Sequence, residues 1–395
     1  MKNYLDKLFE KASLKLEYLK NRKAIFNVPN QKENGDISTN IAMILSKELK
    51  KNPRQIAEEI IANLETESSY IDKTEIAGPG FINFFFKPDF TSNIIKEVLN
   101  EKDNFGKSEK YKNIKAMVEF VSANPTGPLT VGHGRNAVVG DTIANMLEWI
   151  GYNVDREYYF NNAGRQMRML GESTKLRYLQ LLGQNIDFPE DYYQGEYIKD
   201  IAAKLKEEYG DKLIDEPGDG IFKDVSEKEI FADIEKTMNR LNIKFDNYFN
   251  ENSLYEDGRI KTLLNIFQER KVSYEKEGAV WLKLTDMGQE QDKVIVKSTG
   301  EPTYRLPDIA YHITKFERGY DLMVDLFGSD HNATYPDVKA GLRSLGYDDE
   351  KVKVVIHQFV TITEKGEIVK MSTRKANFIT LDELIDEVGP DVVRA

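Results

Sequence analysis

Cysteine is absent from this chain of 395 residues, and histidine occurs only four times. The absence of cysteine excludes disulfides, thiolate metal sites and cysteine nucleophiles. No two of the four histidines have the spacing of zinc ligands; they are His133, His312, His331 and His357. We therefore expect no protein-bound metal.

Long apolar runs are also missing. No uninterrupted run approaches the roughly 18 residues that a membrane-spanning helix needs. The N-terminal segment carries Asp6, Glu10 and Glu17 and has no apolar centre, which argues against a signal peptide and a transit peptide. We expect a cytoplasmic protein without a membrane partner.

The sequence has no excess of basic side chains. It has 55 Lys and Arg against 66 Asp and Glu, a net charge of −11, which argues against a protein that coats DNA through a generally basic surface. The acidic excess lies in residues 111–395, because residues 1–110 hold 18 basic and 17 acidic side chains. The N-terminal part is therefore the better electrostatic candidate for a nucleic-acid contact.

Residues 1–108 have the pattern of a small α+β domain. An amphipathic helix at the start is followed by a helical pair at 38–64 that breaks at Asn52-Pro53. Two buried strands are expected to turn sharply at Gly78-Pro79-Gly80, and a helix with a polar connection follows at 87–111. We place a domain boundary near residue 108.

Residues 109–395 alternate between strand and helix patterns, which is typical of parallel βαβ units. The expected strands lie at 113–121, 152–160, 293–297, 322–328 and 351–360, and the expected helices at 132–150, 307–317 and 333–345. Residues from about 161 to 290 are mostly helical and charged. The pattern predicts a doubly wound, Rossmann-like α/β domain with a parallel sheet, split by a mostly helical insertion.

At the end of the chain, a helix that begins at Pro390 has only five residues, too few to be stable by itself. We expect that the chain has been cut there or that its remainder is missing.

The strongest chemical signal is FVSANPTGPLTVGHGRNAVVGD at residues 120–141. A strand leads through a proline-stiffened loop into a helix whose first turn holds Gly132, His133 and Gly134. Two glycines allow a ligand to approach the backbone, and the N-terminal end of the helix favours phosphate. A histidine placed there can donate to a phosphate oxygen as charge develops on it.

The same residues also fit the dinucleotide fingerprint G-x-G-x-x-A, with Asp155 about where a ribose-binding acid would lie. That fingerprint has its first glycine directly after the strand, whereas here ten loop residues intervene, with Pro125 and Pro128 among them. An NAD-linked oxidoreductase is therefore the weaker alternative. Binding of NAD or of ATP at Gly132–Gly134 distinguishes the two.

Two motifs carry a resemblance to a known family. PLTVGH (128–133) resembles the HIGH signature of class I aminoacyl-tRNA synthetases, and VKMSTRK (369–375) resembles their KMSKS signature. Several further segments are similar to arginyl-tRNA synthetase: FNNAGRQMRMLGES, GEYIKDIA, TYRLPDIAYH, FGSDHNA, NGDISTNIAMILSK, KKNPRQIAEEI and IAGPGFINFFF. The resemblance covers essentially the whole chain and implies that residues 1–108 bind tRNA. Members of the family continue into a helical anticodon-binding domain, which we expect to be absent beyond Ala395.

The resemblance implies a ligase that works in two steps. The carboxylate of L-arginine attacks the α-phosphate of ATP and releases pyrophosphate. The arginyl group then passes to the 2′-hydroxyl of the terminal adenosine of tRNA(Arg), and tRNA is needed even for the first step. ATP is a substrate accompanied by Mg²⁺, and the protein is expected to be a monomer. A non-catalytic tRNA-binding paralogue is an alternative that the retained signatures argue against and that pyrophosphate exchange would decide.

The resemblance also implies roles for single residues. The positions matched to ATP binding are Gly132, His133, Gly134, Asn136, Lys370, Met371 and Ser372, and the catalytic positions are Thr130, His133, Lys370 and Arg374. Two positions depart from the signatures. Thr130 replaces the first histidine of HIGH, and Thr373 replaces the second lysine of KMSKS, so that Arg374 or Lys375 can substitute for it.

The positions matched to arginine binding are Ser122, Asn124, Glu251, Tyr304, Asp308 and His331. Two acids that converge on one pocket suit a cationic ligand, and a guanidinium offers five donors in a planar fork. The alternative for Glu251 and Asp308 is that they are surface acids. A basic patch that could contact tRNA consists of Lys47, Lys50, Lys51 and Arg54, and its alternative is a solvated helix face.

Overall fold

The computed structural model describes residues 1–66, 70–358, 360, 362–364, 367–369 and 379–395. These residues form two compact units, Met1–Gly106 and Lys107–Ala395. In the described part of the chain, no helix is long and apolar enough to cross a membrane.

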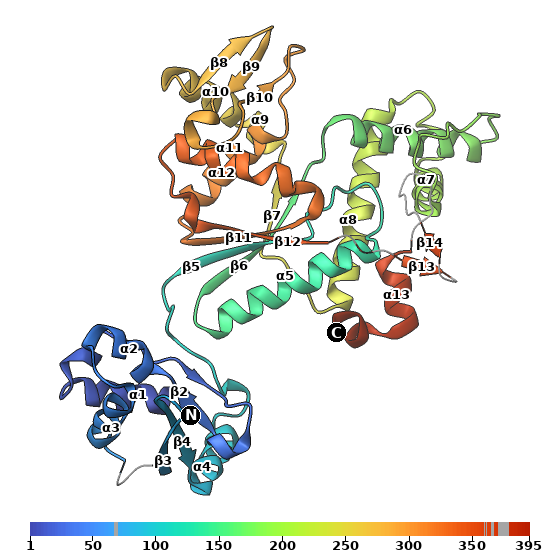
Figure 1. Ribbon diagram of the computed structural model, residues 1–395. Coiled ribbons are helices and arrows are strands. Elements are labelled where there is room, and N and C mark those ends of the chain that lie inside the picture. Colours follow the sequence, from blue (N-terminus) through green and yellow to red (C-terminus); the bar gives the residue numbers. More distant parts are fainter. Residues whose placement is uncertain (67–69, 359, 361, 365–366, 370–378) are drawn as a thin grey trace. The chain divides into compact units, whose positions relative to one another are not determined.

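The first unit packs helices against a four-stranded antiparallel sheet with the strand order β1-β2-β4-β3 (Figure 1). Its strands are β1 (Phe26–Asn27), β2 (Ile37–Thr39), β3 (Ile71–Ala77) and β4 (Phe81–Phe86), and its helices are α1 (Lys2–Ser13), α2 (Ile41–Leu49), α3 (Pro53–Asn63) and α4 (Pro88–Glu101). The predicted break at Asn52-Pro53 is confirmed. The Asn52 side chain accepts a hydrogen bond from the backbone N–H of Arg54 at 2.9 Å, and Pro53 occupies the first turn of α3.

The predicted hairpin at residues 71–87 is also confirmed, with one difference in burial. Strands β3 and β4 pair antiparallel across the glycine-rich turn, where Gly78 has a φ of 51°. Ile82 and Phe84 are fully buried, but Phe81 is 38% exposed. Asn83, on the opposite face, is also buried, so the centre of β4 is covered on both sides and its ends are more exposed.

The second unit contains a five-stranded parallel sheet with the order β12-β11-β5-β6-β7. The strands are β5 (Lys115–Glu119), β6 (Asn153–Phe160), β7 (Asn247–Asn250), β11 (Leu322–Gly328) and β12 (Val352–His357). The order runs outward from β5 in one direction through β6 and β7 and in the other through β11 and β12. This confirms the doubly wound fold and puts the switch point, where such folds bind ligands, between β5 and β11.

Helix α5 (Val131–Trp149) lies on one face of this sheet, and α11 (Arg305–Glu317) and α12 (Tyr335–Ser344) lie on the other (Figure 1). The other helices of the unit are α6 (Gly164–Leu181), α7 (Glu196–Tyr209), α8 (Lys223–Arg240), α9 (Ser253–Glu256), α10 (Arg259–Glu269), α13 (Leu381–Val388) and α14 (Pro390–Arg394). Because successive strand residues face opposite sides, Ala116 and Val118 of β5 join one core with α5 and α6, and Met117 joins another with α10 and α11. Burial on both faces explains the continuous apolar run of β5.

The prediction assigned one strand to the wrong sheet. Residues 293–297 were expected to continue the parallel sheet, but β10 (Lys293–Val296) belongs to a separate antiparallel sheet with β9 (Ala279–Leu282) and β8 (Ser273–Lys276). An apolar run of three residues predicts a strand without specifying its partner. Conversely, the stretch 161–290 contains β7, which joins the main sheet at its edge. Strands β13 (Ile362–Glu364) and β14 (Glu367–Val369) form a short hairpin.

Candidate active site

A cavity of about 550 Å³ opens at the carboxyl ends of the parallel strands, next to the switch point. Its lining comes from the loops after β5, β6, β7 and β11 and from the first two turns of α11. All six positions matched to arginine binding line it: Ser122, Asn124, Glu251, Tyr304, Asp308 and His331. The fold thus gathers into one cavity residues that are as far apart in the sequence as Ser122 and His331.

Glu251 forms part of the polar wall of this cavity. It directly follows β7 and is 9% exposed. Its Oε2 accepts a hydrogen bond from the Tyr159 hydroxyl at 2.7 Å, and its Oε1 accepts one from the Asn161 amide at 2.8 Å. Burial raises the pKa of Glu251 above its ordinary value, although these two donors act in the opposite direction.

Asp308 lies in the first turn of α11. Burial raises the pKa of Asp308 to about 7, because the attraction of His312 and Lys315 does not offset the desolvation and the carboxylates of Glu251 and Glu119 add repulsion. In the described ranges, no lysine or arginine forms an ion pair with either Asp308 or Glu251.

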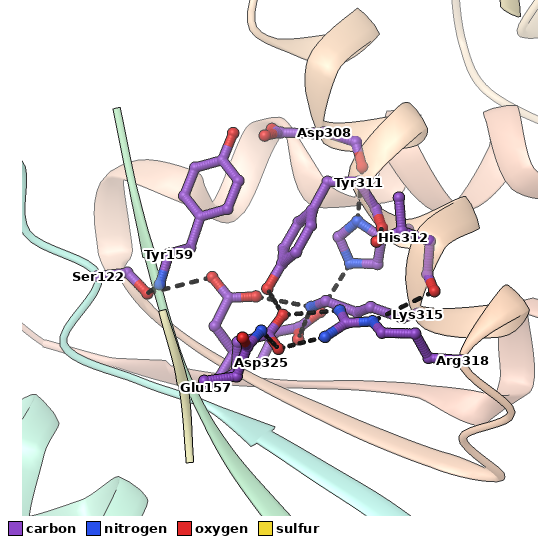
Figure 2. A network of polar contacts seen from close by, with 12 residues as sticks. Ser122, Glu157, Tyr159, Asp308, Tyr311, His312, Lys315, Arg318 and Asp325 are labelled. Carbon is purple, nitrogen blue, oxygen red and sulfur yellow. Dashed lines mark hydrogen bonds and ion pairs between the residues drawn. The ribbon is translucent and has the colours of Figure 1, made fainter. Parts of the chain in front are cut away.

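Two neighbouring buried acids, Asp325 and Glu157, have pKa values that are shifted in the opposite direction (Figure 2). Lys315 lies 2.6 Å from Asp325, and Arg318 lies 2.5 Å from Glu157. Burial would raise the pKa of each acid, but the adjacent cation outweighs it and lowers the pKa below the ordinary value. Glu251 and Asp308 thus differ from Asp325 and Glu157, because among the described residues no lysine or arginine forms an ion pair with them. A third acid of the cavity, Glu119, pairs with Lys315, but burial still raises its pKa. The cavity suits a ligand that brings its own cation.

The remaining positions matched to arginine binding lie nearer the opening. Asn124 is exposed, and its Oδ1 accepts a hydrogen bond from the backbone N–H of Asn161 at 2.9 Å. Tyr304 is 82% exposed just before α11, and His331 stacks on Phe327 with ring centroids 4.8 Å apart. All three side chains are exposed, so they are placed to contact the polar end of a ligand whose cation lies deeper.

Sequence reasoning missed several residues that line the same cavity: Glu119, Tyr159, Asn161, Tyr311 and His312. Two signals could have found some of them. One is a lone acid in the apolar run AMVEFV (116–121), and the other is the spacing of Asp308, Tyr311, His312 and Lys315, which places four polar side chains on one stripe of α11. His312 also contacts Asp325, with Nε2 2.8 Å from the carboxylate.

The first turn of α5 presents the ring N–H of His133 as a hydrogen-bond donor. The Nδ1 atom of His133 accepts a hydrogen bond from the backbone N–H of Thr130 at 3.0 Å, so the ring proton resides on Nε2. Burial lowers the pKa of His133 to about 4. His133 is therefore a neutral Nε2–H donor at neutral pH, which is the state that a contact to a phosphate oxygen needs.

The two glycines of this turn have different roles, which corrects the expectation that both admit a ligand. A Cβ atom on Gly132 would meet only the Thr130 hydroxyl, at 3.6 Å. A Cβ atom on Gly134 would lie 2.7 Å from Cδ1 of Leu381, a fully buried side chain of α13. Gly134 thus allows α13 to pack on α5, and Gly132 alone leaves open space.

Gly134→Ala is expected to lower the free energy of unfolding by about 1–3 kcal/mol, the usual effect of overpacking a core. Gly132→Ala is the matched control and should change stability by less than about 1 kcal/mol, because its new methyl group meets open space. Urea unfolding measures both. Equal stability of the two variants would show that Leu381 repacks without strain.

The comparisons with known proteins agree with this geometry. A family model described as tRNA synthetases class I (R), catalytic domain, matches residues 94–392, and one described as arginyl tRNA synthetase N terminal domain matches residues 2–86. The chain belongs to the arginyl-tRNA synthetase family. The arginine–tRNA ligase of Desulfotalea psychrophila is 56% identical over 93% of this chain and 66% of its own length, and that of Prosthecochloris aestuarii is 52% identical over 100% of this chain and 72% of its own length.

The solved structures show the same fold. Thermus thermophilus arginyl-tRNA synthetase superimposes with a TM-score of 0.70 at 19% identity, over 98% of this chain and 69% of that chain. This chain therefore spans about two thirds of the length of the synthetases that it matches.

Membership of the family also removes the alternative of an NAD-linked oxidoreductase. Asp155, its expected ribose ligand, lies near the start of β6, away from the ligand-binding edge, and accepts from the Tyr320 hydroxyl at 2.6 Å.

Several positions assigned from the family resemblance are less directly placed. Lys370, Met371, Ser372 and Arg374 lie outside the described residues. Asn136 lines the cavity, but its amide is already engaged, because Oδ1 accepts from the Val121 N–H at 2.7 Å and Nδ2 donates to the Leu326 carbonyl at 3.2 Å.

The basic patch of the first unit is partly neutralised. Lys51 pairs with Glu59, and Arg54 donates to the Gly78 carbonyl at 2.7 Å. Lys47 and Lys50 are exposed on α2 and at its end. The patch consequently offers fewer unengaged cations for phosphate than its sequence suggests.

Proposed function

We propose that this chain activates L-arginine with ATP and transfers the arginyl group to the 2′-hydroxyl of the terminal adenosine of tRNA(Arg). The observation that carries the proposal is the pair Glu251 and Asp308, two acids with raised pKa values that face one cavity and form no ion pair with a lysine or arginine of the described residues. A guanidinium placed between them supplies that cation and can donate to both carboxylates in its plane. Tyr159 and Asn161 hold Glu251 in place for this contact.

ATP would bind beside this pocket, at the start of α5. The open space at Gly132 admits the phosphates, the helix N-terminus attracts their charge, and the Nε2–H of His133 donates to an oxygen of the reacting phosphate. Thr130 contributes by orienting the His133 ring. In this proposal Lys370, Met371, Ser372 and Arg374 contact the nucleotide and the departing pyrophosphate, and Mg²⁺ enters with ATP as part of the substrate.

The first unit would contact tRNA through Lys47, Lys50, Lys51 and Arg54. Lys47 and Lys50 carry most of this contact, because the other two cations already have protein partners. We further propose that the protein acts as a monomer in the cytoplasm.

Pyrophosphate exchange into ATP tests this function. The expected result is exchange that needs both arginine and tRNA(Arg) and is not supported by lysine. Exchange supported equally by other amino acids would contradict the assignment of the cavity. Transfer of the arginyl group to tRNA without activation is not expected, because transfer consumes the arginyl-adenylate that activation forms.

His133→Ala is expected to slow arginine activation by about 10²-fold, the scale for losing one preorganised donor, with little change in the Kd of arginine. Because His133 is a neutral donor, His133→Gln should recover part of the rate through its amide N–H. The measurement is the exchange rate at saturating substrates. A variant with the wild-type rate would remove His133 from the mechanism, and equal losses in both variants would favour proton transfer over hydrogen bonding.

A further inference from the structure

Lys315 is a fully buried cation that does not line the cavity. It lies on α11, and its Nζ donates to Oε2 of Glu119 and to Oδ1 of Asp325, both at 2.6 Å (Figure 2). The Nζ atom also lies 4.3 Å from the centre of the Tyr311 ring. Burial would lower the pKa of Lys315, but the carboxylates of Asp325 and Glu119 outweigh it and raise the pKa, so the side chain stays charged.

Glu119 connects Lys315 to the wall of the cavity. Its Oε1 accepts a hydrogen bond from the Ser122 hydroxyl at 3.2 Å, and the same hydroxyl accepts one from the backbone N–H of Tyr159 at 3.2 Å. Val121 and Ser122 have φ values of 66° and 47°, a left-handed conformation that is costly for a β-branched residue such as valine. A strained turn of this kind persists only where its surroundings hold it, and Glu119 is one of the groups that do so.

Asp325 connects Lys315 to the other wall. Its Oδ2 lies 2.8 Å from Nε2 of His312, and Nδ1 of His312 lies 2.7 Å from the carbonyl oxygen of Asp308 (Figure 2). Both ring nitrogens thus face oxygen atoms, and the backbone at Asp308 is tied to β11 through this ring. Lys315 therefore bonds directly to Glu119, which contacts Ser122, and to Asp325, which contacts Asp308 through His312.

We propose that Lys315 is a positioning residue of the arginine site, which acts through Glu119 on the Val121–Ser122 turn and through Asp325 and His312 on the first turn of α11. This inference rests on the proposed function, because it concerns the site that binds arginine. It predicts that loss of Lys315 weakens arginine binding without any loss of a direct contact.

A purely structural role for Lys315 is the alternative, and the chain offers a matched control for it. Arg318, the residue after α11, pairs with the fully buried carboxylate of Glu157, which also accepts from the Tyr311 hydroxyl at 2.6 Å. Glu157 does not line the cavity. Breaking this pair should disturb the same helix and sheet while leaving the contacts of Ser122 and of the Asp308 carbonyl in place, although Tyr311, which donates to Glu157, lines the cavity.

The first comparison is calorimetric titration of arginine into the wild type, Lys315→Met and Arg318→Met. Both variants are expected to unfold at lower temperature, because each leaves a buried carboxylate without its cation. Only Lys315→Met should raise the Kd of arginine, by about 10- to 100-fold, the range seen when the partner that orients a ligating group is lost. Equal Kd values in the wild type and Lys315→Met, or equal increases in both variants, would overturn the proposal.

A second pair decides the matter even if Lys315→Met does not fold. In Glu119→Gln, Lys315 keeps its ion pair with Asp325 and can donate to the new amide oxygen. The second variant combines Glu119→Gln with Lys315→Met, and in it Asp325 keeps its contact with His312. The double variant should bind arginine at least tenfold more weakly than Glu119→Gln alone. Equal binding by the two would refute a positioning role. Failure of the proposed function is distinguishable from these outcomes, because the wild type would then not bind arginine.

Discussion

Glu251→Gln is expected to weaken arginine binding by about 10²- to 10³-fold or more. The substitution leaves a desolvated guanidinium with one fewer counter-charge, and breaking a buried ion pair in this way costs about 3–5 kcal/mol. The loss should fall on arginine alone, because the proposed ATP site lies at the start of α5 and not at the end of β7. The Tyr159 and Asn161 side chains that hold Glu251 can also hold the amide, so the fold of the site should be kept.

A panel of ligands makes this test specific. Lysine should not rescue Glu251→Gln, because a compact ammonium cannot reach acceptors placed for a planar fork. Citrulline, which is neutral and similar in shape, should lose less affinity than arginine does, or gain relative to it. Calorimetric titration of the three ligands measures these differences, with Asp257→Asn as an exposed control six residues further on. If arginine bound Glu251→Gln and the wild type equally well, Glu251 would not belong to the pocket.

Asp308→Asn is expected to weaken arginine binding by a similar factor. It should also change how the Kd of arginine depends on pH. In the ligand-free protein the pKa of Asp308 is raised to about 7, so below neutral pH arginine must displace a proton. The Kd of arginine for the wild type should thus be constant above about pH 8 and rise by up to about tenfold per pH unit below pH 6. Asp308→Asn should bind about 10²-fold more weakly at pH 8, with most of this pH dependence removed.

The same carboxylate should make the ligand-free protein less stable at high pH. Because the pKa of Asp308 is higher in the folded than in the unfolded chain, its contribution to stability is present below about pH 4 and is lost as the pH rises through about 7. Asp308→Asn should therefore raise the free energy of unfolding by about 2–4 kcal/mol at pH 8 and change it little at pH 4. Urea unfolding without arginine at both pH values checks this, and a variant that is less stable at pH 8 would contradict the assigned pKa.

The elements that the sequence predicted correctly are those whose signals are local. The break between α2 and α3 follows from an asparagine cap and a proline at adjacent positions, and the hairpin of β3 and β4 follows from a glycine-rich turn between two apolar runs. The start of α5 follows from a proline-stiffened loop that leads into a helix. Each signal lies within a few residues, so no information about distant partners is needed.

The sequence also identified the six positions matched to arginine binding, through motifs and not through periodicity. Motifs name residue types, but they do not say how each side chain is held. The raised pKa values of Glu251 and Asp308, and the neutral state of His133, depend on desolvation and on hydrogen bonds that exist only in the folded chain.

By itself, then, the sequence determined the family, the doubly wound pattern and six of the residues that line the cavity. The tertiary structure decided which strands share a sheet, since β7 and β10 are both short and their pairing depends on packing. It also decided that Gly134 serves the packing of α13, and that Lys315 meets Glu119, a residue 196 positions away. The physical reason is the same in each case. Local patterns specify the conformation of a segment, but its partner is set by which surfaces can be buried together with every charge and donor satisfied.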